Sequence, residues 1–238
     1  MLIRISAPIT AAVAVALALL GAAAPFAPAS AQSAKISLIR DAEAENIIRA
    51  YATPLFQAAG LNPEDVRIHL VNDRALNAFV AGGQRLFINT GLILQSQHSG
   101  QLIGVIAHEI GHISGGHLSK MEDEMRRASA QQILAMIIGG AAAIGTGRGD
   151  AGAAVMMGGA STALRGFLAF TRTQESAADA AALNVLDQTR QSAQGLLEFM
   201  QFLEKQDPRS PDRQDPYLRT HPLSRDRVEV LRQHVAAS

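Results

Sequence analysis

His108-Glu109-Ile110-Gly111-His112 lies in an apolar stretch whose large aliphatic residues recur at helical spacing. Because an α-helix turns by about 100° per residue, two histidines four positions apart share a face and can bind one metal ion together. Glu109 then lies beside that ion, where a carboxylate can take a proton from a metal-bound water. This H-E-x-x-H pattern is typical of zinc sites that carry out hydrolysis. The alternative is a pair of helix histidines with ordinary surface hydrogen bonds.

A tetrahedral zinc site needs at least one further protein ligand. Glu175 is a candidate because it begins another helix and has Asp179 one turn later on the same face. Asp179 would then accept the free ring N–H of a ligating histidine. Alternatively, both acids stabilise the start of their helix through its dipole, and the spacing alone favours neither interpretation. His117 is about 140° from His112 on a continuing helix, so we interpret it as structural.

The remaining pattern predicts an α+β, mainly helical fold with a small antiparallel sheet. Alternating or short apolar runs between turns predict strands at residues 66–71, 75–80 and 85–89. Helical spacing predicts helices at residues 37–59, 99–118, 174–188 and 192–206, and one after Ser224. Residues 133–170 are unusually apolar and are interrupted by glycines near residue 147, which predicts a helical hairpin or lid. His69 falls on the polar side of its strand and is expected to be solvated.

Composition and the amino terminus narrow the functional class. The 21 Lys and Arg residues balance 21 Asp and Glu residues, which argues against a nucleic-acid-binding protein. The chain has no cysteine, so a metal site must use His, Asp or Glu. Residues 1–31 combine Arg4, an apolar run and Ala29-Ser30-Ala31, which predicts a signal peptide and a periplasmic mature chain, residues 32–238. The alternative is an uncleaved membrane anchor, for which the apolar run is short.

Five ordered motifs together resemble the HtpX/BepA-like family of gluzincin metallopeptidases, which is related to the CAAX prenyl proteases and the Oma-type proteases. The motifs are Asn77-Ala78-Phe79, Phe87-Ile88-Asn89-Thr90-Gly91, the H-E-x-x-H sequence, Glu175 to Asp179, and His221-Pro222. The similarity runs from about Ser37 to Val235. It implies a gluzincin-type domain with one zinc ion per chain, bound by His108, His112 and Glu175. It also implies that Glu109 is the general base and acid and that Asp179 supports the ligands.

The resemblance implies further roles outside the zinc ligands. The strand around Arg85 and Phe87 resembles the family's edge strand, which pairs with an extended substrate. Asn77 helps to order the cleft or, alternatively, only stabilises a turn. His221 resembles a loop histidine that serves as a fourth metal ligand and keeps the enzyme inactive, unless it is a surface residue. Arg227 matches a family arginine near the substrate, where it would stabilise an oxyanion.

We therefore expect a zinc metalloendopeptidase that cleaves exposed or misfolded envelope proteins. A chaperone-like protein that binds such clients with little turnover is the alternative. No helical-repeat domain of the BepA type is expected after the last helix. Residues 133–170 are the candidate for membrane contact, and their apolar halves are short for a span, so a peripheral contact is expected.

Overall fold

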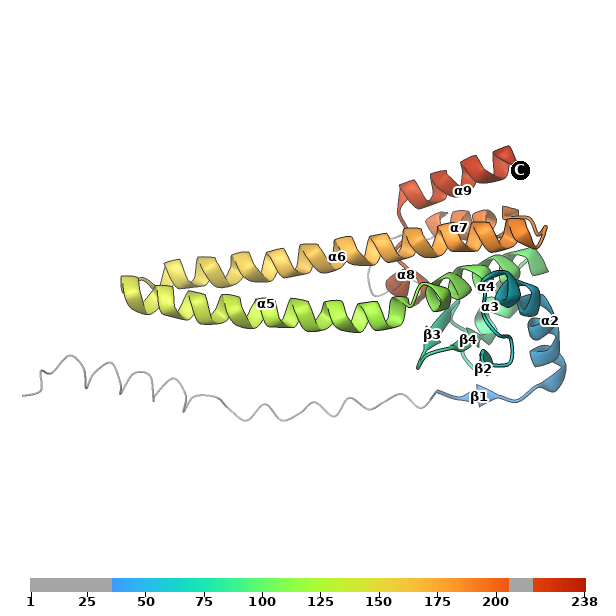
Figure 1. The fold of residues 1–238 in the computed structure, drawn as a ribbon, viewed down its shortest axis with the longest axis horizontal. Helices are drawn as coiled ribbons and strands as arrows, with labels where there is room; N and C mark the ends of the chain where they lie inside the picture. Colours follow the sequence, from blue (N-terminus) through green and yellow to red (C-terminus); the bar gives the residue numbers. More distant parts are fainter. Residues whose placement is uncertain (1–35, 206–215) are drawn as a thin grey trace, which may run out of the picture. The chain divides into compact units, whose positions relative to one another are not determined.

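The computed structural model describes residues 36–205 and 216–238, and the predicted signal peptide, residues 1–31, lies outside the described residues. The strands are β1 (Leu38–Ile39), β2 (Arg67–Val71), β3 (Ala78–Ala81) and β4 (Arg85–Asn89). The helices are α2 (Ala42–Ala58), α3 (Thr90–Gln95), α4 (Ser99–Ser114), α5 (His117–Thr146), α6 (Gly149–Gln188), α7 (Gln194–Lys205), α8 (Pro216–Thr220) and α9 (Arg225–Ala237). The expectation of an α+β, mainly helical fold is confirmed (Figure 1).

The four strands form one sheet in the order β1-β2-β4-β3. The two outer pairs are antiparallel, whereas β2 and β4 run parallel with Arg67 opposite Arg85. The expectation of an antiparallel sheet is therefore wrong for the central pair. The β3–β4 hairpin turns at Gly82 and Gly83, which both have positive φ, so β4 returns between β2 and β3. Residues 86–89 of β4 are all buried, as is typical of a central strand covered on both faces.

The first elements begin later than expected. Leu38 and Ile39 pair with β2 as a short strand, although the spacing predicted a helix from residue 37. Helix α2 begins at Ala42, where the side chain of Asp41 accepts a hydrogen bond from the backbone N–H of Ala44 at 3.0 Å. Such a cap satisfies one of the free N–H groups at a helix start, which explains why the helix begins there.

Helix α4 carries the H-E-x-x-H motif through the hydrophobic core. Its fully or almost fully buried aliphatic residues are Leu102, Val105, Ile106 and Ile110. Gly111 allows α6 to approach closely, since a Cβ at this position would lie 2.6 Å from the carbonyl oxygen of Ala178. Gly104 has the same effect toward α7, where a Cβ would lie 2.7 Å from the backbone nitrogen of Leu196. The motif is thus fixed between α6 and α7.

Helix α4 ends earlier than expected, at Ser114 instead of near Leu118. Gly116 has a φ of 61°, a left-handed conformation that glycine adopts readily, and α5 begins directly after it. The chain changes direction at this break. His117 therefore does not occupy the position that a continuing helix predicts.

Helices α5 and α6 lie side by side in a long hairpin that turns at Gly147 and Arg148 (Figure 1). The apolar residues 133–170 lie within this hairpin, and the helix expected from Gln174 is the last part of α6. Among the described residues, α5 and α6 each contain a segment long and apolar enough to cross a membrane. The expectation that the apolar halves are too short for a span is therefore wrong for the helices that contain them, which have 30 and 40 residues.

Candidate metal centre

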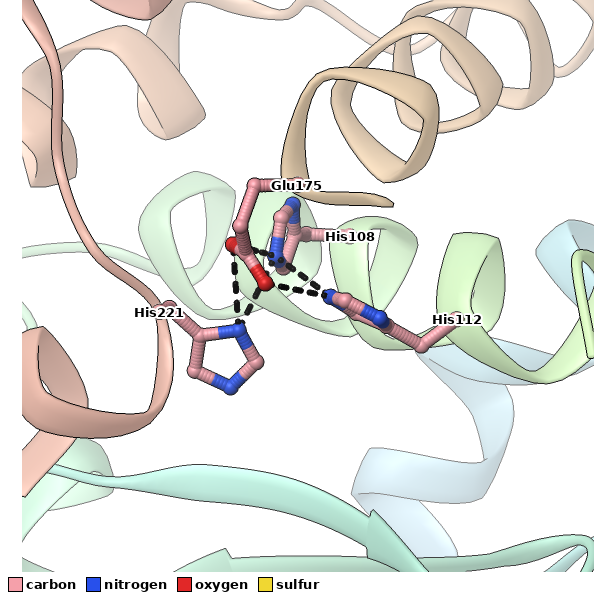
Figure 2. A group of neighbouring side chains, drawn as sticks. All are labelled: His108, His112, Glu175 and His221. Carbon is pink, nitrogen blue, oxygen red and sulfur yellow. Dashed lines mark hydrogen bonds and ion pairs between the residues drawn. The ribbon is translucent and has the colours of Figure 1, made fainter. Parts of the chain in front are cut away.

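Four side chains from three segments of the chain converge on one another. His108 and His112 come from α4, Glu175 comes from α6, and His221 comes from the loop between α8 and α9. Figure 2 shows these side chains directed toward one another, and their potential ligand atoms all lie within 4.8 Å. Three of the four residues are buried and His112 is largely so, which excludes bulk water from most of the cluster.

The distances within this cluster fit a single metal ion. His108 Nε2 lies 3.1 Å from His112 Nε2 and 3.4 Å from a carboxylate oxygen of Glu175. The other oxygen of Glu175 is 3.3 Å from His112 Nε2, and His221 Nδ1 is 3.3 Å from both His108 Nε2 and Glu175 Oε2. Two atoms that bind an ion at about 2.0–2.1 Å and at the tetrahedral angle are about 3.3–3.4 Å apart. The donor set of three imidazoles and one carboxylate also suits a divalent transition metal.

The second ring nitrogen of each histidine on α4 has its own partner. Nδ1–H of His108 donates to Oδ1 of Asp179 at 2.8 Å, as expected for a ligand held in one tautomer. Nδ1 of His112 lies 3.0 Å from Nδ1 of His117. His117 therefore contacts a candidate ligand from outside the four-residue cluster. Helical spacing does not predict this contact, because the contact depends on the helix break at Gly116.

The charges of the cluster shift the pKa values of its members. Burial acts to lower the pKa of His108, but hydrogen bonds to Asp179 and Glu175 outweigh it and raise this pKa to about 9. Burial acts to raise the pKa of Glu175, but hydrogen bonds from the histidines hold it below its usual range. Glu175 is thus anionic across the physiological pH range and could bind a metal cation.

Glu109 is fully buried beside the cluster. Within residues 36–205 and 216–238, neither of its carboxylate oxygens has a hydrogen-bond partner, and Oε1 lies 3.4 Å from Nε2 of His221. Burial raises the pKa of Glu109 to about 7. A buried carboxylate without hydrogen bonds is rare in proteins, and carboxylates whose pKa is shifted in this way cluster at functional sites.

The side chain of Arg227 contacts other residues of the protein around the cluster and does not face the adjacent cavity. Its guanidinium group binds both oxygens of Asp179, lies 3.0 Å from Oε2 of Glu175 and donates to the carbonyl oxygen of Pro222 at 2.9 Å. Arg227 is buried and is not among the residues that line the adjacent cavity. The geometry therefore favours a structural role over the expected contact with an oxyanion.

The strand that was expected at the edge of the sheet is a central strand. β4, which contains Arg85 and Phe87, is paired on both sides, so it cannot accept a substrate strand. The side chain of Phe87 is buried and stacks on His69 and Phe79, each with ring centroids 4.9 Å apart. His69 is accordingly half-buried and not fully solvated as expected. Within the described part of the chain, the free edge next to the cluster belongs to β3, and Asn77 directly precedes it.

A cavity of about 490 Å³ lies beside the cluster and is called the cleft cavity below. Its lining residues are Asn77, Phe79, Val80, His112, His117, Leu118, Met121, Gln174, Glu175, Thr220 and His221. Asn77 thus lines the cleft cavity, whereas Arg85 and Phe87 do not. Tyr217, which the sequence did not single out, stacks on His221 with ring centroids 4.5 Å apart.

An α+β domain in which two buried histidines of an H-E-x-x-H helix meet a glutamate of another helix is the architecture of a metallopeptidase. The chain matches the model of Peptidase family M48 over residues 39–235 and belongs to this family, which confirms the resemblance noted from the motifs. The chain is 29% identical to the beta-barrel assembly-enhancing protease of Escherichia coli (strain K12) over 196 residues, or 82% of this chain and 39% of the relative. It is 27% identical to the Yersinia pestis protein of the same name over 203 residues, or 81% and 41%. The chain thus spans about two fifths of the length of these relatives.

Proposed function

We propose that this metallopeptidase is a zinc endopeptidase that cleaves exposed or misfolded proteins of the bacterial envelope. The observation that carries the proposal is the buried carboxylate of Glu109, which lies without a hydrogen bond among the described residues beside four convergent ligand groups. His108, His112 and Glu175 would hold the ion. A bound zinc ion would polarise the scissile carbonyl and lower the pKa of a water molecule toward 7.

Glu109 is the group that would move the proton. Its pKa of about 7 is close to the operating pH, where one carboxyl group can both accept and donate a proton. The helix geometry of α4 holds Glu109 next to the ligand His108, and its complete burial keeps competing water away. The proton would pass from the attacking water to Glu109 and then to the leaving amine.

His221 is proposed to limit access to this centre. Its Nδ1 lies among the candidate ligand atoms, and its Nε2 lies near Glu109. A fourth histidine ligand would take the coordination position that a catalytic zinc site leaves open for water. Movement of the loop between α8 and α9 would then open the site to a substrate.

The proposal is tested with casein and with two variants of the zinc-loaded protein. Glu109→Gln should keep zinc and lose casein cleavage, whereas His221→Ala should keep zinc and cleave faster than the unchanged protein. Full activity in Glu109→Gln would overturn the assignment of the base. If neither the unchanged protein nor His221→Ala cleaves casein, while both bind zinc and unfolded clients, the chaperone-like alternative is correct.

We also propose that the α5–α6 hairpin contacts the hydrocarbon of a lipid bilayer, which places the enzyme at an envelope membrane. Residues 128–147 and 151–164 carry no charged side chain. At 1.5 Å per residue they are about 30 Å and about 21 Å long, against a hydrocarbon core of about 30 Å. The predicted signal peptide and the similarity to beta-barrel assembly-enhancing proteases support the same location.

The packing of the hairpin supports this contact. Small residues meet where the helices touch, since a Cβ added to Gly159 would lie 2.2 Å from that of Ala135. Large residues face outward, with Ile137, Ile144 and Met157 exposed by 64%, 86% and 71%. Small residues between helices and large apolar residues outside are typical of helices packed in lipid.

The hydroxyl groups of the uncharged segments have partners within their own helices. Ser129, Thr146 and Thr162 each donate to the carbonyl oxygen four residues earlier, at 2.6–2.9 Å. The hydroxyl groups therefore need no water, which removes much of the cost of placing them in hydrocarbon.

Flotation with phosphatidylethanolamine/phosphatidylglycerol vesicles tests the membrane contact. The unchanged protein should float with the vesicles, and the double variant Ile137→Lys, Ile144→Lys should not. The matched control, Asn184→Lys with Gln188→Lys, adds the same charge at exposed polar positions of α6 outside the uncharged segments and should still float. Equal behaviour of the two double variants would overturn this part of the proposal, and casein cleavage in each variant reports separately on the protease.

A further inference from the structure

The apolar lining of the cleft cavity comes from two elements of the fold. Phe79 and Val80 of β3 form one wall, and Leu118 and Met121 at the start of α5 form another. Its volume of about 490 Å³ falls within the range of about 300–1,000 Å³ that is typical of ligand-binding pockets. The cavity can therefore receive a large side chain together with part of its backbone.

No charged side chain outside the metal cluster lines the cleft cavity among the described residues. Glu175, His112 and His221 belong to the cluster, and His117 is bonded to one of its members. A charged substrate side chain placed between the apolar walls would lose its hydration without gaining a counter-ion. Burial of an unpaired charge is costly, so the cavity discriminates against such residues.

Two carboxamides that line the cavity provide polar contacts of a different kind. Oδ1 of Asn77 and Oε1 of Gln174 are buried and have no hydrogen-bond partner within the described ranges. Both residues line the cavity, and Asn77 directly precedes the free edge of β3. Two unpaired acceptors beside an open strand edge are suited to the backbone N–H groups of an extended peptide.

We propose that the cleft cavity binds a bulky apolar residue next to the scissile bond, and that Asn77 and Gln174 bind the adjacent peptide backbone. This inference rests on the proposed function and specifies its substrate class. The substrate is an extended segment that carries Leu, Phe or Met at this position. In folded proteins such residues are mostly buried, so the preference selects chains that have unfolded or have not yet folded.

Fluorescence-quenched peptides that differ at one position test the preference. The zinc-loaded protein should cleave peptides with Leu, Phe or Met beside the scissile bond faster than those with Asp, Glu or Lys, on the order of tenfold or more in kcat/KM. Leu118→Glu should reduce cleavage of the apolar peptides and raise cleavage of the Lys peptide. Ser119→Glu is the matched control, because it adds the same charge one residue further along α5 at an exposed position.

A binding measurement separates this inference from the proposed protease function. Zinc-loaded Glu109→Gln should bind the apolar peptides more tightly than the charged ones, measured by fluorescence anisotropy. If no variant cleaves any peptide but this selectivity of binding persists, the protease proposal fails and the cavity assignment holds. If the protein cleaves all peptides equally, or Leu118→Glu and Ser119→Glu behave alike, the cavity assignment fails and the protease proposal holds.

Discussion

Arg227 and Asp179 form a buried two-pronged ion pair, with Nε 2.5 Å from Oδ2 and Nη2 2.8 Å from Oδ1. The third nitrogen of the guanidinium group lies 3.0 Å from Glu175 and donates to the carbonyl oxygen of Pro222. One side chain of α9 therefore joins two carboxylates of α6 to the loop that carries His221. The last helix of the domain is in this way a structural part of the metal centre.

Loss of the guanidinium group should destabilise the protein strongly. Arg227→Met leaves the carboxylates of Asp179 and Glu175 buried without their cation, and breaking a buried ion pair in this way costs about 3–5 kcal/mol. Urea unfolding of the metal-free protein measures the loss. Arg225→Met is the control, because Arg225 is exposed on the same helix, and its effect should stay within about 0.5 kcal/mol. Equal losses in the two variants would contradict the structural role of Arg227.

Asp179→Asn should weaken metal binding more than it weakens the fold. The carboxylate accepts the Nδ1–H of His108, and loss of such a supporting partner typically lowers metal affinity by about 10–100-fold. Competition with a chelator of known zinc affinity measures the change. Asp187→Asn removes an exposed carboxylate from the same helix, where it pairs with His234 at 3.0 Å, and should leave zinc affinity unchanged. An unchanged affinity in Asp179→Asn would exclude the supporting role.

The sequence predicted those parts of the metal centre that lie close together in the chain. Two histidines four residues apart on one helix share a face whatever surrounds them, so the pairing of His108 and His112 follows from helix geometry alone. Glu175 and Asp179 also share a face, but their position opposite α4 depends on packing between distant helices. The spacing made them candidates without deciding their role, and the family resemblance favoured the metal site. The close approach of α4 and α6 depends on Gly111, and the H-E-x-x-H motif alone does not indicate that a glycine is needed at this position.

The features that the sequence did not predict depend on non-local structure. The strand order places β4 between β2 and β3, and hydrophobic alternation carries no information about which strand becomes an edge. His117 reaches His112 because Gly116 adopts a left-handed conformation, and an isolated glycine in a helical pattern does not always end the helix. The family resemblance assigned Arg227 to the substrate. Its carboxylate partners are 48 and 52 residues away in the chain, so residue spacing does not predict the ion pairs.

The glycine inside the H-E-x-x-H motif should tolerate no side chain. A Cβ on Gly111 would meet the backbone of Ala178, at 2.6 Å from its oxygen and 2.9 Å from its Cα, and α6 would have to move away from α4. Gly111→Ala should therefore cost about 1–3 kcal/mol of stability, measured by urea unfolding, and should weaken zinc binding as Glu175 moves with α6. Gly140→Ala is the control, since a Cβ there meets no atom within 4 Å among the described residues, and it should be neutral or stabilising by up to about 1 kcal/mol.

Zinc binding should release a proton from His108. In the metal-free protein, burial opposes the charge on this ring, but Asp179 and Glu175 raise its pKa to about 9, so the imidazolium form dominates at pH 8. This raised pKa stabilises the metal-free fold fully below the ordinary value of 6.5, and the contribution is lost as the pH rises through about 9.

A metal ligand must be neutral at the binding nitrogen, so zinc has to displace the Nε2 proton, and about one proton should leave at pH 8. Calorimetric titrations in two buffers with different ionisation enthalpies measure the number released. The number should fall toward zero as the pH rises above about 9, because the ring is then already neutral. Asp179→Asn should reduce the release at pH 8, because the ring loses the carboxylate that favours its charged form. Release that does not change between pH 8 and pH 10, or that is the same in Asp179→Asn, would show that His108 is not the source of the proton.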